Sequence, residues 1–142
     1  MTMLLVDTTA SEPCPLGFQG DTAPLVYFMS FAVAERYGAL HPLAQAASLL
    51  RRQLRVDISP LMRFTSALPE GPEDVEELEG LWQDPSPLAR TCQEIAHALR
   101  HHPRLRALTA DFPTLPERLE ELAAIAQWAA QQGAKIRLTY LL

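Results

Sequence analysis

The sequence lacks asparagine and contains only two cysteines, Cys14 and Cys92. Their wide separation is not the spacing of a zinc site, and it favours a reducing cytosol over a disulfide scaffold. The sequence also lacks a P-loop, a dinucleotide-binding glycine motif, a serine-hydrolase elbow and an H-E-x-x-H helix. We therefore expect a non-catalytic protein that needs no cofactor.

Long hydrophobic runs are missing too. The longest, residues 25–34, has about half of the roughly 20 residues that a membrane-spanning helix needs. The first residues carry no basic segment of the kind that opens a signal peptide. The formal net charge of −5 disfavours binding to nucleic acid or anionic membranes. We expect a cytoplasmic protein.

What the sequence does contain is enough apolar material for one core. It has 142 residues, of which 48% are hydrophobic and 20% charged, within the range of globular domains. A chain of this length buries roughly 68–70% of its unfolded surface. We therefore predict a single globular domain over residues 1–142, stable without disulfides or a structural metal.

Twelve prolines lie between the apolar segments and mark helix boundaries. The helices predicted from these boundaries and from helical spacing cover residues 24–37, 42–54, 59–68, 70–80, 86–102, 104–109 and 114–132. The first is apolar on almost every side, with Gly38 as its C-cap, and is predicted to be the buried central element. Thr114 and Glu117 predict a capping box.

Two segments are predicted to be strands. Residues 3–7 are apolar, and residues 134–142 alternate as a half-buried strand does. Because a lone strand is unstable, we expect the two to pair, with strand exchange in a homodimer as the alternative. The fold class is therefore mainly α, or α+β through this pair, with about five to seven helices. The long loop over residues 8–23 is expected to drape over the core or to be mobile.

Residues 89–102 concentrate the candidate metal ligands. Glu94, His97 and His101 are spaced to converge on one helix face. That face lies opposite the predicted core stripe, which contains Cys92, and no second ligand set is evident. The favoured interpretation is a solvated helix face, and a metal or acid/base site is the alternative.

Two charged clusters are candidate binding surfaces. Arg51, Arg52 and Arg55 follow each other near a helix C-terminus, where the helix dipole favours positive charge, and an anion site is the alternative. Residues 70–79 contain six acidic side chains, and no basic residue follows until Arg90. The six are Glu70, Glu73, Asp74, Glu76, Glu77 and Glu79. They are interpreted as a solvated helix, or as a surface that docks a basic partner.

Trp128 falls on the polar side of the last predicted helix. Exposed tryptophan is enriched at interfaces, so either a partner or the long loop is expected to cover it. Together these features predict a protein-interaction or regulatory domain that associates with itself or with a basic protein, not with nucleic acid or a membrane. The alternative is a small-molecule or anion-binding protein, or an enzyme, with a pocket beside residues 25–37 that is lined by Tyr27, Tyr37 and the arginines.

Overall fold

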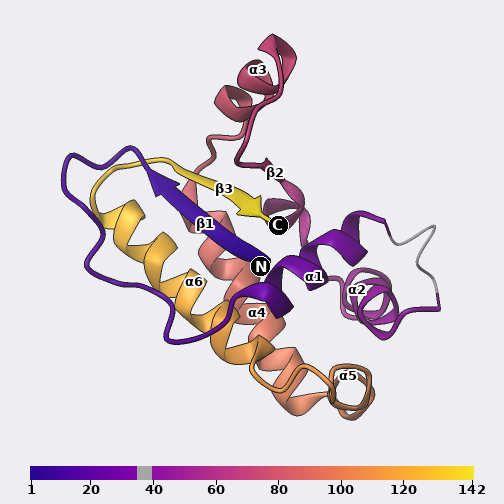
Figure 1. Cartoon of the computed structure of the whole chain (residues 1–142). Coiled ribbons are helices and arrows are strands. Elements are labelled where there is room, and N and C mark those ends of the chain that lie inside the picture. Colours follow the sequence, from indigo (N-terminus) through magenta and orange to yellow (C-terminus); the bar gives the residue numbers. More distant parts are fainter. Residues whose placement is uncertain (35–39) are drawn as a thin grey trace.

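The computed structural model describes residues 1–34 and 40–142. These residues form a mainly α fold with a small sheet, which confirms the predicted fold class (Figure 1). The helices are α1 Ala23–Val33, α2 Pro42–Arg52, η1 Ser59–Met62 (a 3-10 helix), α3 Pro72–Gly80, α4 Pro85–His101, α5 Pro103–Leu108 and α6 Leu115–Gln131. The strands are β1 Met3–Thr8, β2 Phe64–Ser66 and β3 Ile136–Leu141. No helix in the described ranges is long and apolar enough to cross a membrane.

The helices α4 and α6 pack side by side and form the centre of the core (Figure 1). Each carries the buried stripe that its spacing predicts. On α4 the stripe is Leu88, Cys92, Ile95 and Leu99, and on α6 it is Leu115, Leu119, Leu122 and Ala126. Side chains at these intervals lie on one face of a helix, so the two stripes meet between the helices.

The prediction that residues 24–37 form a helix buried on all sides is wrong. α1 ends at Val33, and the predicted end at Tyr37 with Gly38 as C-cap lies outside the described residues. Leu25, Phe28 and Met29 are fully buried, but Tyr27 and Val33 are 42% and 54% exposed. α1 packs against α2, β1, η1 and α6, and its exposed apolar residues include Tyr27 and Val33.

Helix ends depart from the prediction in several places. Asp84, not Ser86, caps α4, because its Oδ1 accepts a hydrogen bond from the Ser86 N–H at 3.1 Å. The Thr114 side chain makes no capping hydrogen bond on α6, so the predicted capping box does not form. Glu117 lies instead 3.6 Å from the Arg118 guanidinium. α2 ends at Arg52 rather than Leu54, and Leu54 is 38% exposed.

The predicted helix over 59–68 is also wrong. Only Ser59–Met62 is helical, as a single 3-10 turn, and Phe64–Ser66 is the strand β2. Hydrogen bonds from the Ser59 side chain and backbone to Asp57 hold the pKa of that carboxyl below its usual value. β2 pairs in parallel with β3, and this long-range pairing decides the conformation of 64–66.

The sheet has the order β1-β3-β2, with β1 antiparallel to β3. The expected pairing of the two terminal strands is thus confirmed within one chain, and β2 adds a third strand that was not predicted. Six residues of the sheet belong to the apolar core or pack against it: Leu4, Val6, Phe64, Ile136, Leu138 and Tyr140. The alternation of β3 predicts Thr139 on the solvent side, but in the structure it is only 2% exposed.

Residues 9–22, here called the strap, connect β1 to α1 and run back beside α6 (Figure 1). The Gln19 N–H donates to Glu121 Oε2 at 2.9 Å. Gly20 lies against the buried Arg118, whose Nη2 is 2.9 Å from the place that a Cβ on Gly20 would occupy. These contacts connect the end of the strap to α6.

Candidate functional site

Residues 67–80, here called the acidic arm, lead from β2 through α3 and stand away from the helices (Figure 1). None of the residues of α3 is buried, and its apolar Val75 is 49% exposed. Leu68, at the base of the arm, is 67% exposed. The predicted acidic residues Glu73, Glu76 and Glu77 are all exposed on this helix.

Two arginines hold the C-terminal end of α3 to the body of the domain. Arg63 Nη2 donates to the Gly80 carbonyl oxygen at 2.9 Å, and Arg137 Nη1 donates to the Leu78 carbonyl oxygen at 3.3 Å. The last carbonyl groups of a helix have no partner within the helix, and the helix dipole makes this end negative. Arg63 therefore supplies a partner for the Gly80 carbonyl. Arg137 adds a second donor to the Leu78 carbonyl, which also accepts from the Leu81 N–H.

Arg137 is the central residue of this attachment. Its guanidinium carbon lies 4.3 Å from the Trp82 ring centroid, and its Nη2 lies 3.2 Å from Asp7 Oδ2. Glu79, the last acidic residue of the arm, is 4.0 Å from Nη1. Strand β1, strand β3 and the arm thus meet at one side chain, of which 19% is exposed.

The charge of the arm is one-sided. From residue 64 to residue 89 there is no lysine, arginine or histidine. Glu73 and Asp74 lie in the first turn of α3, where the helix dipole favours carboxylates. Asp74 Oδ2 accepts a hydrogen bond from the Glu70 N–H at 2.9 Å and closes the turn before the helix. The rest of the acidic side chains face solvent.

The second candidate cluster, on α4, is a solvent-exposed face as its spacing indicated. Glu94, His97 and His101 are all exposed, and the two imidazole centroids are 4.4 Å apart. Cys92 is fully buried on the other side, and burial raises the pKa of its thiol. Within residues 1–34 and 40–142, no three His, Cys, Asp or Glu side chains are arranged to hold a metal ion.

Arg51 and Arg52 are the last two residues of α2, and Arg55 follows the helix. Arg51 is half-buried, and its guanidinium contacts the Ala32 carbonyl oxygen at 3.4 Å and the Met62 sulfur at 3.7 Å. Arg52 and Arg55 are exposed. Arg55 adopts a positive φ of 57°. Arg51 therefore connects α2 to α1 through the Ala32 carbonyl oxygen.

The structure describes two of the three aromatic residues that the sequence singled out. Trp128 is half-buried on α6, and Tyr27 is exposed on α1. Tyr37, expected to line a pocket with Tyr27, lies outside the described residues. A groove of about 500 Å³ between α4 and α6 is lined by Arg90, Gln93 and Gln127 among others, and Trp128 is not part of its lining.

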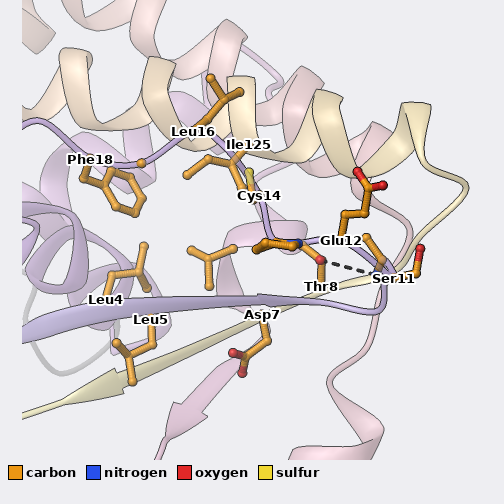
Figure 2. Close-up of a pocket in the computed structure, with 14 residues that line it drawn as sticks. Leu4, Leu5, Asp7, Thr8, Ser11, Glu12, Cys14, Leu16, Phe18 and Ile125 are labelled. Atoms are coloured by element: carbon orange, nitrogen blue, oxygen red, sulfur yellow. Dashed lines mark hydrogen bonds between the residues drawn. The ribbon is translucent and has the colours of Figure 1, made fainter.

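A different cavity, which sequence reasoning missed, lies between β1 and the strap. Its volume is about 440 Å³ (Figure 2). Leu4 and Val6 of β1, Cys14 and Phe18 of the strap, and Ile125 of α6 contribute to its walls. Because these residues come from distant parts of the chain, no local pattern could have indicated the cavity.

The residues that anchor the arm and the strap were not predicted from the sequence, although the position of Arg118 within its helix could have indicated its burial. Arg118 follows Leu115 by three residues and precedes Leu122 by four, so it falls on the inward stripe of α6. Its 5% exposure and its ion pair with Glu121 agree with that position. Arg137 and Trp82 carried no such signal, because they are brought together only by the sheet.

Comparisons of this chain with protein-family models, curated protein sequences and solved structures found no match.

Proposed function

We propose that this chain is a non-catalytic protein-interaction domain that docks a basic protein partner through the acidic arm. The observation that carries the proposal is that α3 is a formed helix without a buried residue. Helices this short are marginal in water, and most are stabilised by packing an apolar face against other elements. α3 instead holds Val75 in solvent. A partner surface would supply the missing packing.

Charge selects the partner. Six carboxylates on a protruding segment without a basic residue create a negative field that accelerates the approach of a positively charged surface. Docking would cover Val75 and Leu68, two exposed apolar residues of the arm. The favoured partner is therefore a protein with a basic patch that surrounds a small apolar depression.

The test compares two charge-matched triple variants. The arm variant carries Glu73→Gln, Glu76→Gln and Glu77→Gln. The control carries Glu94→Gln, Asp111→Asn and Glu120→Gln, three exposed acids outside the arm. Each protein is immobilised and exposed to an extract of its source cells, and retained proteins are identified by mass spectrometry.

The proposal requires a basic protein that the wild type and the control retain and that the arm variant releases. Affinity for this protein should fall steeply between about 50 and 200 mM salt, because ionic strength screens exposed charges. Val75→Ala should weaken the complex without changing the salt dependence. Equal retention by the arm variant and the control would show that the arm is not the docking surface.

Self-association is measured on the same three proteins by light scattering. A monomer has a mass of 15.8 kDa. A dimer that the arm variant disrupts and the control preserves would replace the basic partner with a second copy of this chain, and would overturn the proposal as stated.

A further inference from the structure

The helix α4 presents two imidazoles side by side on its solvent face. His97 and His101 are both exposed, and their ring centroids are 4.4 Å apart. They stand four residues apart, so they are neighbours on one face of the helix. No hydrogen bond or ion pair to another described residue occupies either ring. The two rings therefore keep their nitrogen atoms available to a ligand.

The backbone under these two rings is held in place. The opposite face of α4 carries the buried Ile95 and Leu99 and packs along α6. The helix runs through His101, and the His102 N–H donates to the Ala98 carbonyl oxygen at 2.8 Å. Side chains on a rigid helix keep a fixed spacing, so little conformational entropy is lost when both bind the same ligand.

The separation of the rings fits a chelated transition-metal ion. Imidazole nitrogen binds such ions at about 2.0–2.1 Å, which places each ring centroid about 3.2 Å from the metal. Two centroids 4.4 Å apart then subtend an angle of about 90° at the metal. A tetrahedral site has an angle of roughly 109° and would set the centroids about 5.2 Å apart. The observed spacing is that of neighbouring ligands in a square-planar or tetragonal site.

The ligand type and the angle together select the metal. Imidazole is a ligand of Zn²⁺, Cu²⁺ and Ni²⁺, and a square-planar or tetragonal set of nitrogen and oxygen ligands favours Cu²⁺ or Ni²⁺. Cu²⁺ binds a given set of ligands more tightly than Ni²⁺ or Zn²⁺ does. A structural zinc site needs four protein ligands, whereas this face supplies two imidazoles. The pair therefore fits Cu²⁺ best.

The charges around the pair allow a cation to approach. Glu94 is exposed on the same side of α4, one turn before the pair, and its carboxylate attracts a positive ion. Arg100 is paired with Glu120 of α6, which compensates its charge. Arg90 and Arg104 are exposed, so solvent and salt screen their repulsion.

We propose that His97 and His101 form a two-imidazole chelate for one Cu²⁺ ion on the solvent face of α4. One nitrogen lone pair of each ring binds the ion and displaces a water molecule from it. Water keeps the remaining positions. This site shares no residue with the acidic arm, so the two proposals succeed or fail separately.

The test titrates Cu²⁺ into four full-length proteins and follows binding by isothermal titration calorimetry. All four carry Cys14→Ser, because the half-buried Cys14 thiol would compete for Cu²⁺ and reduce it. One protein has no other change and is the reference, and two others add His97→Gln or His101→Gln. The fourth adds His102→Asn as the control, which removes a neighbouring imidazole but keeps an acceptor for the Leu105 N–H.

We expect the reference protein and the His102→Asn control to bind one Cu²⁺ at their tightest site with the same affinity. His97→Gln and His101→Gln should each weaken this binding at least about ten-fold, because a second imidazole on the same helix acts at a high effective concentration. Zn²⁺ should bind the reference protein at least about ten-fold more weakly than Cu²⁺. The electron paramagnetic resonance spectrum of bound Cu²⁺ should be axial, as a tetragonal site requires.

A second measurement locates the ion without any substitution in the pair. Cu²⁺ is paramagnetic, and an amount below one equivalent broadens the NMR signals of the backbone amides nearest to it. The reference protein should lose the signals of residues 94–101 first. It should keep those of α3 and of residues 1–8.

Four results would overturn the proposal: no saturable binding, equal affinity of His97→Gln and the reference protein, an equal loss in His102→Asn, or broadening centred on another segment. Tighter binding of Zn²⁺ than of Cu²⁺ would overturn the choice of metal. Circular dichroism checks that each variant is folded. Because the NMR measurement needs only the reference protein, it decides the question even if a variant of the pair does not fold.

Discussion

The guanidinium of Arg137 stacks over the ring of Trp82 with 4.3 Å between the guanidinium carbon and the ring centroid. Arg137 lies on the central strand of the sheet, and Trp82 follows the acidic arm. The same guanidinium donates to the Leu78 carbonyl oxygen at the end of α3. A single side chain thus connects the sheet to a helix that buries none of its own residues.

Arg137→Leu should release the arm. It removes the stack, the hydrogen bond to Leu78 and the ion pair with Asp7, for a total loss of about 1–2 kcal/mol in the free energy of unfolding. Hydrogen exchange should quicken selectively in α3. Arg137→Lys keeps the charge but loses the planar stack. Its exchange rate in α3 should therefore lie between those of the wild type and Arg137→Leu. Arg104→Leu, at an exposed position on α5, is the control. Unchanged exchange in α3 of Arg137→Leu would contradict this account of the attachment.

The two long helices should respond differently to loss of their N-cap side chains. Asp84→Ala removes the hydrogen bond to the Ser86 N–H and should lower the free energy of unfolding by about 1 kcal/mol. Asp84→Asn keeps a hydrogen-bond acceptor and should therefore keep most of the wild-type free energy of unfolding. Thr114→Ala removes no capping bond and should change stability by less than about 0.5 kcal/mol. Urea unfolding measures the stability of all three variants. A larger loss for Thr114→Ala would show that the Thr114 side chain does cap α6.

Gly133 should resist replacement. It ends α6 at a φ of +67°, and the Ala134 N–H behind it donates to the Ala129 carbonyl oxygen. Gly133→Ala forces a Cβ into the left-handed region and should cost about 1 kcal/mol. Gly17→Ala is the matched control, since Gly17 has no positive φ and nothing within 4 Å of an added Cβ. Thermal unfolding of the two variants should separate them by several degrees.

The two cysteines should differ in reactivity. Burial raises the pKa of the Cys92 thiol above its ordinary value of 9.0, so the folded protein keeps it protonated. Iodoacetamide should modify half-buried Cys14 in the native state and Cys92 only as urea unfolds the chain. Mass spectrometry of each peptide across a urea series measures this. Native-state labelling of Cys92 would show that α4 opens locally.

The raised pKa of Cys92 also gives stability a pH dependence of defined sign. Below pH 9.0 the thiol is protonated in both the folded and the unfolded chain and has no effect. Above it, the unfolded thiol ionises while the folded one does not, so the free energy of unfolding falls as pH rises. Cys92→Ala should abolish this part of the decline, and urea midpoints at pH 8 and pH 10 compare the two proteins.

Much of the fold follows from local pattern. The apolar spacing of residues 88–99 and 115–126 predicts the two stripes that form the core, because the α-helical period fixes which side chains share a face. The alternation of residues 136–140 likewise predicts a strand that needs a partner. The acidic segment was evident from composition, but the cavity was not, because β1, the strap and Ile125 meet only in the folded chain.

Two of the failed predictions have a common cause. Residues 64–66 became a strand because β3 offered them a pairing edge, and a local helical signal carries less free energy than such a ladder. Thr114 and Glu117 matched a capping box, but Glu117 lies instead beside Arg118. In each case a long-range or neighbouring contact displaced a weak local preference.

The sequence by itself determined most of the helices, the pairing of the terminal strands and the position of the acidic segment, because these depend on periodicity and charge along the chain. Only the tertiary structure decided that α3 stands clear of the core, that Arg63 and Arg137 anchor it, and that Val6 faces a cavity beneath the strap. These features depend on which distant residues the sheet and α6 bring within hydrogen-bonding or van der Waals distance, and no local pattern encodes those distances.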